Sequence, residues 1–224
     1  MLLSLMLLAL LPGALGAEGR VVVVRNDSSP VSRAVADDYA RRRGVPDVVA
    51  VRCPDSAAGA DQETVSFAVY EACIERPLRA FLKTHPKIDF IVLTKGVPIR
   101  IEDAPGHGMG DKRPALDSTL AALDYATIPD AINVRMSDSG FTGTTWANRF
   151  WNAGEPFSHA KFGGYLVTRL DGLTEADAKA LTTRALESER HPPAGAILLD
   201  TCPTFGYADS KRQPSPLLKN PAVR

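Results

Sequence analysis

The stretch IDFIVLTKGVPIR, Ile88–Arg100, decides the fold of this chain. Its apolar run, Ile88–Leu93, is short, rich in β-branched residues and bounded by Pro86 and Gly96. Such a run is typical of a strand that is buried on both faces in a parallel sheet. It breaks into the polar residues Thr94-Lys95-Gly96, and residues that follow such a strand lie at the edge where α/β proteins bind ligands.

The segments on either side continue the alternation of strands and helices. Further strands are predicted at Arg20–Arg25, Val48–Val51, Tyr165–Arg169 and Ala196–Leu199, with Val97–Ile101 as a short extended continuation of the central strand. Helices are predicted from Pro30 to Arg43, from Ser66 to Thr84, at Leu116–Leu123, and from Thr174 to Arg190. Pro77 must kink the second of these or start a further helix. The fold class is therefore α/β, a mostly parallel sheet with helices on both faces in a single domain over residues 18–224.

Helical spacing also predicts which side chains face the core. The inward sets are Phe67, Tyr70, Ile74, Leu78, Phe81 and Leu82 in the kinked helix, and Ala178, Leu181, Ala185 and Leu186 in the last helix.

Composition and the first residues narrow the function. The 224 residues carry 26 basic and 26 acidic side chains, so the chain lacks the basic footprint of a nucleic-acid-binding protein. Residues 1–17 combine an apolar run, Pro12-Gly13 and the small-residue site Ala14-Leu15-Gly16, which predicts a signal peptide, either cleaved or retained as an anchor. We therefore expect an exported protein, and we expect no membrane span beyond this segment.

The span 124–164 shows no sustained periodicity and holds five large aromatic residues, Phe141, Trp146, Phe150, Trp151 and Phe157. An aperiodic stretch of this length is either a functional loop or poorly ordered. Its aromatic residues could form a sugar- or peptide-binding surface, or could fold back as a hydrophobic lid. The tail after residue 203 has little pattern.

Metal and disulfide sites are not indicated by spacing. His107, Asp103, Asp111 and Asp117 match no ligand template, so we expect a solvated loop, no bound metal and no cofactor. Cys53, Cys73 and Cys202 fit no zinc motif. An exported location permits a disulfide, but the odd number leaves one thiol unpaired.

Three motifs in order, VLTKGVPIRI (Val92–Ile101), LDSTLAAL (Leu116–Leu123) and LVTRLDG (Leu166–Gly172), carry a resemblance over residues 20–200. The chain resembles a large uncharacterised family of exported bacterial proteins whose members read "LVTRGVPLRI … SVDSELALL … LVTRLDGP". Members of that family are usually longer, which implies truncation after the fifth strand. More distantly, the order of elements resembles that of gingipain-type cysteine peptidases, with Thr168-Arg169 and Glu187-Ser188-Glu189 in similar places. This likeness implies a caspase-like or Rossmann-like sandwich and no particular activity.

Caspase-like peptidases place a catalytic histidine after one apolar strand and a catalytic cysteine after the next. His107 and Cys202 are the candidate dyad here, because a thiolate paired with an imidazole is a competent nucleophile and base. His107, however, lies in a glycine-rich loop well beyond Leu93. A loop histidine and a structural thiol are the alternative reading.

The remaining candidate is the edge where the parallel strands end. It should collect Asn26, Asp27, Thr94, Lys95, Arg169, Asp171, Asp200 and Cys202. We expect Asn26, Asp27, Lys95, Arg169 and Asp200 to bind a ligand, with Lys95, Arg169 and Asp200 lining one cleft under the 124–164 loop. A network of structural ion pairs is the alternative.

The sequence thus predicts an exported domain that binds a peptide or a glycan. A cysteine-peptidase-like hydrolase, active or decayed, and a fragment that needs further sequence to fold are the alternatives.

Overall fold

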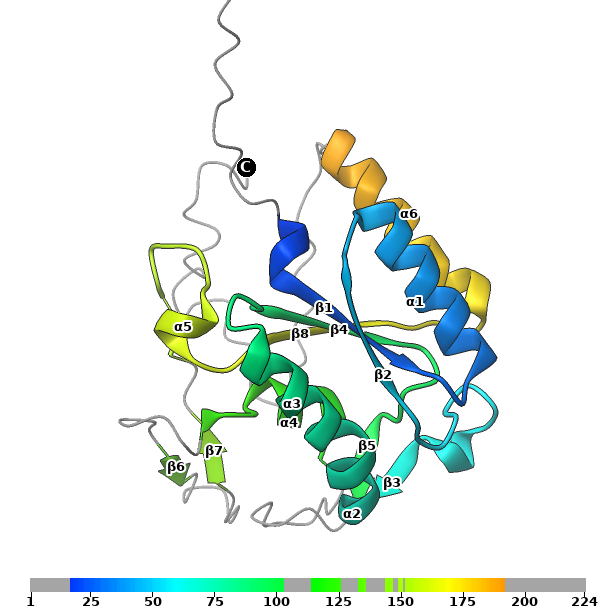
Figure 1. The fold of residues 1–224 in the computed structure, drawn as a ribbon, viewed down its shortest axis with the longest axis horizontal. Coiled ribbons are helices and arrows are strands. Elements are labelled where there is room, and N and C mark those ends of the chain that lie inside the picture. The colour runs from blue at the N-terminus through cyan, green and yellow to red at the C-terminus, as the bar shows by residue number, and fades with distance from the viewer. Residues whose placement is uncertain are drawn as a thin grey trace, which may run out of the picture.

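The computed structural model describes residues 17–102, 114–125, 133–135, 144–146, 149–150 and 152–191, and every structural statement below concerns these residues (Figure 1). Its principal strands are β1 (Val21–Asn26), β2 (Asp47–Val51), β4 (Phe90–Thr94) and β8 (Leu166–Leu170). Its longer helices are α1 (Pro30–Arg43), α3 (Arg76–Thr84) and α6 (Glu175–Arg190). The predicted signal peptide up to residue 16, the predicted strand Ala196–Leu199 and the tail lie outside the described residues.

The four principal strands form one parallel sheet in the order β2-β1-β4-β8. The two central strands, β1 and β4, are buried on both sides, and Val22, Val23, Val24, Ile91 and Leu93 have no exposed surface. Each of these two strands reads as a continuous apolar run because neither face meets water. The predicted α/β class is confirmed.

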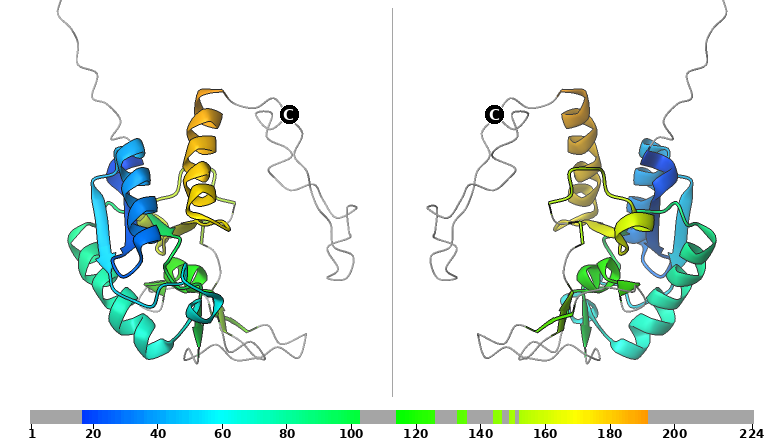
Figure 2. Two further views of the ribbon diagram at one scale, coloured as in Figure 1. Left: turned by 90° about the vertical axis from the view of Figure 1, so that its right-hand side faces the viewer. Right: turned by 90° about the vertical axis from the view of Figure 1, so that its left-hand side faces the viewer.

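Helices cover both faces of this sheet (Figures 1 and 2). Alternate side chains of β1, among them Val21 and Val23, pack with Val35 of α1 and Ala178 of α6. The other alternation, Val22 and Val24, faces a larger cluster that also contains residues of α2 (Phe67–Tyr70), η3 (Glu71–Glu75), α3 and α4 (Leu116–Ala121). The chain therefore forms the three layers that the sequence predicts.

The predicted kink of the second helix has a defined form. Residues 67–84 divide into α2, the single π-helical turn η3 and α3, and Pro77 lies in the first turn of α3. Proline has no N–H to donate, so the regular ladder breaks before it and the chain widens into the π turn. Tyr70, Ile74, Leu78 and Leu82 are buried as expected, whereas Phe67 and Phe81 are only half-buried.

The predicted extension of the central strand is wrong. Gly96 has a φ of 97° and turns the chain away after β4. The following segment forms β5 (Arg100–Glu102), which pairs in parallel with β3 (Thr64–Ser66) in a separate two-stranded sheet. Two short elements complete this side of the chain, η1 (Ala17–Arg20) before β1 and η2 (Ala60–Gln62) before β3.

The predicted inward face of α6 is correct at Ala178 and Leu181, which belong to the core cluster or pack against it. Ala178 and Thr182 are buried, Leu181 and Leu186 are half-buried, and Ala185 is exposed. The helix packs against α1 as well as against β8, so part of the face that it buries is turned toward α1 (Figure 1).

The described part of the 124–164 span contains β6 (Asn133–Arg135), β7 (Thr144–Trp146) and α5 (His159–Phe162). The rings of Phe90, Phe150, Phe157 and Phe162 form a chain of contacts with centroids 5.1–6.5 Å apart. Phe90 is the first residue of β4, and the N–H of His159 donates to Asp89 at 2.6 Å. Residues 152–164 thus pack at the end of the sheet where the strands begin. These residues do not cover the end where the strands finish, and residues 126–132, 136–143, 147–148 and 151 of the predicted cover lie outside the described residues.

Candidate functional site

The carboxyl ends of β1, β4 and β8 converge at one edge, which we call the C-terminal rim and define as residues 26–29, 94–98 and 169–172. The register pairs Leu93 with Arg169 and Thr94 with Leu170, so Lys95 and Asp171 emerge side by side. The N–H of Lys95 donates to the carbonyl of Leu170 at 2.8 Å, which extends the ladder into the rim. The predicted convergence of Asn26, Asp27, Lys95 and Arg169 at one edge is therefore present.

The chain leaves β1 toward one face of the sheet and leaves β4 toward the other, and α/β proteins usually open a ligand crevice at such a point. Here the Asn26 side chain occupies the position where such a crevice would open. Its fully buried amide donates to the carbonyls of Cys53, Pro54 and Gly96 at 2.8–3.2 Å and accepts from the N–H groups of Ser28 and Cys53. Its side chain has no capacity left for a ligand.

Asp27 is also engaged within the chain. Its carboxylate accepts from Arg25 Nε at 2.8 Å, and its carbonyl accepts from Arg33. The β1 exit is therefore a braced turn leading into α1, whose N-cap Ser29 accepts from the N–H of Ser32.

Arg169 holds three segments together. Its Nε lies 3.1 and 3.2 Å from the two carboxylate oxygens of Asp117, while Nη1 donates to the Val97 carbonyl at 2.7 Å and Nη2 to the Pro98 carbonyl at 2.9 Å. Only 10% of the Arg169 side chain is exposed. The planar guanidinium is suited to this fork of acceptors. Sequence reasoning missed Asp117 as its partner, although the LDSTLAAL motif that accompanies LVTRLDG contains it.

Lys95 and Asp171 form the part of the rim that retains unused bonding capacity. Lys95 Nζ donates to Asp171 Oδ1 at 3.1 Å, and this oxygen also accepts from the N–H of Gly172 at 2.7 Å. Among the described residues, Asp171 Oδ2 and the other hydrogens of the ammonium have no partner. The side chains are 17% and 33% exposed, so solvent reaches both groups.

The start of α6 adds negative charge beside this pair. Thr174 and Asp177 form a capping box, in which each side chain bonds the backbone N–H of the other residue. The bond from the Thr174 side chain, more than the Lys95 charge, keeps the pKa of the Asp177 carboxyl below its ordinary value. Lys95 therefore pairs directly with Asp171 and contributes only a small part of the lowering of the Asp177 pKa.

The structure does not place the other predicted site residues. Asp200, His107, Cys202, Asp103 and Asp111 lie outside the described residues. Within the described ranges, no group of three or more histidine, cysteine or acidic side chains could hold a metal ion. No helix in these ranges is long and apolar enough to cross a membrane.

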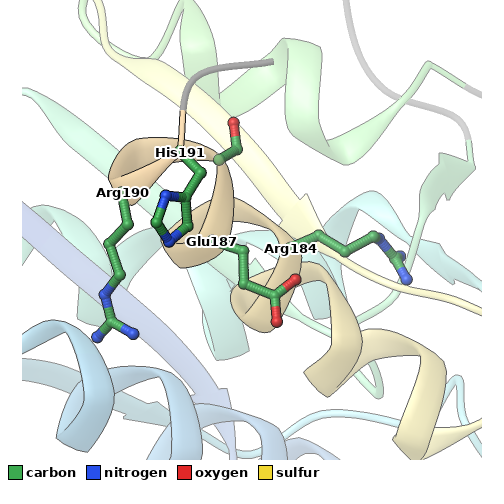
Figure 3. Close-up of a pocket in the computed structure, with 5 residues that line it drawn as sticks. Arg184, Glu187, Arg190 and His191 are labelled. Atoms are coloured by element: carbon green, nitrogen blue, oxygen red, sulfur yellow. The ribbon is translucent and has the colours of Figure 1, made fainter.

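An open hollow lies along the final turns of α6. This open space of about 530 Å³ is lined by Arg184, Glu187, Ser188, Arg190 and His191. Figure 3 shows the guanidinium groups of Arg184 and Arg190 pointing apart on either side of Glu187 and His191. Side chains that diverge from a single helix do not converge on a ligand, and cations are common at a helix C-terminus because of its dipole.

Comparison of the chain with protein-family models, with curated proteins and with solved structures found no match. The C-terminal rim is therefore the feature of the described residues from which a function can be inferred.

Proposed function

We propose that this domain binds a peptide carrying opposite charges, at the Lys95–Asp171 pair of the C-terminal rim. The observation that carries the proposal is the unused bonding capacity of this half-buried pair. An acidic group can accept from the free hydrogens of Lys95, while a basic group donates to Asp171 Oδ2. Neither step requires the existing ion pair to break.

The position of the aromatic residues favours a peptide over a glycan. Sugar sites usually present aromatic rings, but the four described phenylalanines that cluster lie where the strands begin, at the other end of the sheet. The rim offers charged and main-chain groups instead, which suit the charged side chains and amides of a peptide.

Binding without cleavage fits the chemistry at the two strand exits. The peptidase arrangement needs an imidazole after one strand and a thiol after the next, and here Lys95 and Asp171 occupy the exits of β4 and β8. The alternative of a cysteine-peptidase-like hydrolase depends on His107 and Cys202. Selective labelling of Cys202 by a thiol-directed peptidase inhibitor, abolished by His107→Ala, would favour that alternative.

Export belongs to the same proposal and rests on residues 1–17. Mass spectrometry of the extracytoplasmic fraction should find a chain that begins at residue 17 or close to it. An intact Met1 in that fraction would exclude cleavage and leave the segment as an anchor.

The test uses an array of short synthetic peptides in which acidic and basic residues occur at every relative spacing. Peptides with both charges should bind, and Lys95→Met should weaken the best of them about tenfold, as expected for one charge-assisted bond. Lys161→Met is the matched control, because Lys161 forms a 2.6 Å pair with Glu155 at the other end of the sheet. Equal loss in both variants, or no binding by the wild type, would refute the proposal.

A further inference from the structure

Two cysteines that are far apart in the sequence reach the same side of the sheet. Cys53 follows β2, has 6% of its surface exposed and belongs to the larger hydrophobic cluster. Cys73 lies in the π turn η3, is half-buried and packs against that cluster. Both thiols are free in the structure.

The neighbours of the two residues place them in one layer. Tyr70 and Ile74 flank Cys73 along η3 and its N-cap, and both are fully buried members of the cluster that contains Cys53. The backbone of Cys53 is fixed by two hydrogen bonds with Asn26, and its side chain belongs to the buried cluster of this layer.

We propose that Cys53 and Cys73 form a disulfide under oxidising conditions and that Cys202 is the unpaired thiol of the chain. The bond would close residues 54–72, which carry η2, β3 and α2, into a loop anchored between β2 and α3. Closing a loop of this kind restricts the unfolded chain and so favours the folded state. The proposal is independent of the peptide-binding function.

The reaction needs a disulfide donor, for which oxidised glutathione serves. The half-buried Cys73 thiolate attacks the donor, forms a mixed disulfide and releases one glutathione thiolate. The Cys53 thiolate then attacks the Cys73 sulfur and releases the second glutathione, so two protein thiols lose two electrons and two protons.

The second step should be the slower one. Burial, with a smaller effect from the neighbouring Cys73, raises the pKa of the Cys53 thiol to about 12. Only the thiolate attacks a disulfide, so oxidation of the folded protein should accelerate as the pH rises.

The full chain is equilibrated with oxidised glutathione, alkylated under denaturing conditions and digested with glutamyl endopeptidase. This enzyme can cleave after Glu63 and Glu71, which separates the two cysteines, whereas trypsin has no efficient site between them. We expect a Cys53–Cys73 cross-linked pair in the wild type and in Cys202→Ser.

Oxidation should also raise the melting temperature, and reduction should reverse the rise. Cys202→Ser should keep this shift, whereas Cys73→Ser should lose it. Cys73 is half-buried, so its replacement tests the bond even if Cys53→Ser fails to fold. Recovery of both thiols in alkylated form, stable mixed disulfides with glutathione, or linkage of either residue to Cys202 would overturn the proposal.

Discussion

Arg169 is a predicted ligand-binding residue whose guanidinium is engaged within the chain. It joins β8 to Asp117 of α4 and to the carbonyls of Val97 and Pro98. Arg169→Ala should lower the free energy of unfolding by about 2–3 kcal/mol, because it leaves the Asp117 carboxylate and the Pro98 carbonyl without a donor. The Val97 carbonyl keeps its bond from the Ser56 hydroxyl. The value lies below that of a fully buried pair because a third of Asp117 is exposed.

Urea unfolding of three variants checks this role. Arg169→Lys should recover only part of the loss, since an ammonium cannot reproduce the planar fork. Arg100→Ala is the control, because the Arg100 side chain that pairs with Glu63 is 47% exposed and the pair should contribute less than about 1 kcal/mol. If Arg169→Ala were as stable as Arg100→Ala, the structural role would be wrong.

Gly96 is the second residue on which the rim depends. A Cβ atom there would lie 2.8 Å from the Ser29 Cβ and 3.0 Å from the Ser32 Cβ, at a φ of 97° that L-residues rarely adopt. Gly96→Ala should therefore destabilise the protein by about 2–4 kcal/mol through strain and overpacking.

Thermal melting of Gly154→Ala provides the comparison. Nothing lies within 4 Å of a Cβ built at Gly154, so this variant should melt close to the wild type. Similar melting temperatures for the two variants would show that the Ser29–Gly96 contact is looser than the structure indicates.

At the level of elements, the start of α6 is set by the Thr174–Asp177 capping box. Thr174→Ala removes the side-chain acceptor for the Asp177 N–H and should cost about 1 kcal/mol at neutral pH. Urea unfolding measures this difference.

The cost should depend on pH in a known direction. The pKa of Asp177 is lowered in the folded state, first by the Thr174 side chain, so its contribution is present above the ordinary aspartate pKa. That contribution is lost as the pH falls through the folded value. The gap between wild type and Thr174→Ala should therefore narrow at acidic pH, and a gap that widens there would contradict the capping-box assignment.

The elements that sequence predicts well are those whose pattern has a single explanation. Phe90–Leu93 and Val21–Val24 are apolar throughout, and a strand buried on both faces is the structure that needs such a run. The face of α6 was predicted less well, because its packing against α1 is a tertiary contact that periodicity does not encode. The pairing of β5 with β3, rather than with the central sheet, is likewise a tertiary contact that periodicity does not encode.

At the scale of the whole molecule, the two ends of the sheet differ in chemistry. The strands begin among phenylalanines and finish among ion pairs and capped turns. Sequence predicts that polar residues gather where parallel strands end, because each follows an apolar run. It does not predict which of these polar groups are already hydrogen-bonded within the chain. Asn26 and Arg169 use their bonding groups to brace the fold, whereas Lys95 and Asp171 retain free bonding groups.

The most direct test of the central claim is to map where a bound peptide perturbs the protein. Backbone amide shifts in NMR spectra are recorded while the best peptide from the array is added. We expect the largest changes at Lys95, Gly96, Asp171 and Gly172, and we expect them to disappear in Lys95→Met. Changes centred instead on Phe157, His159 and Phe162 would place the site at the other end of the sheet and exclude peptide binding at the C-terminal rim.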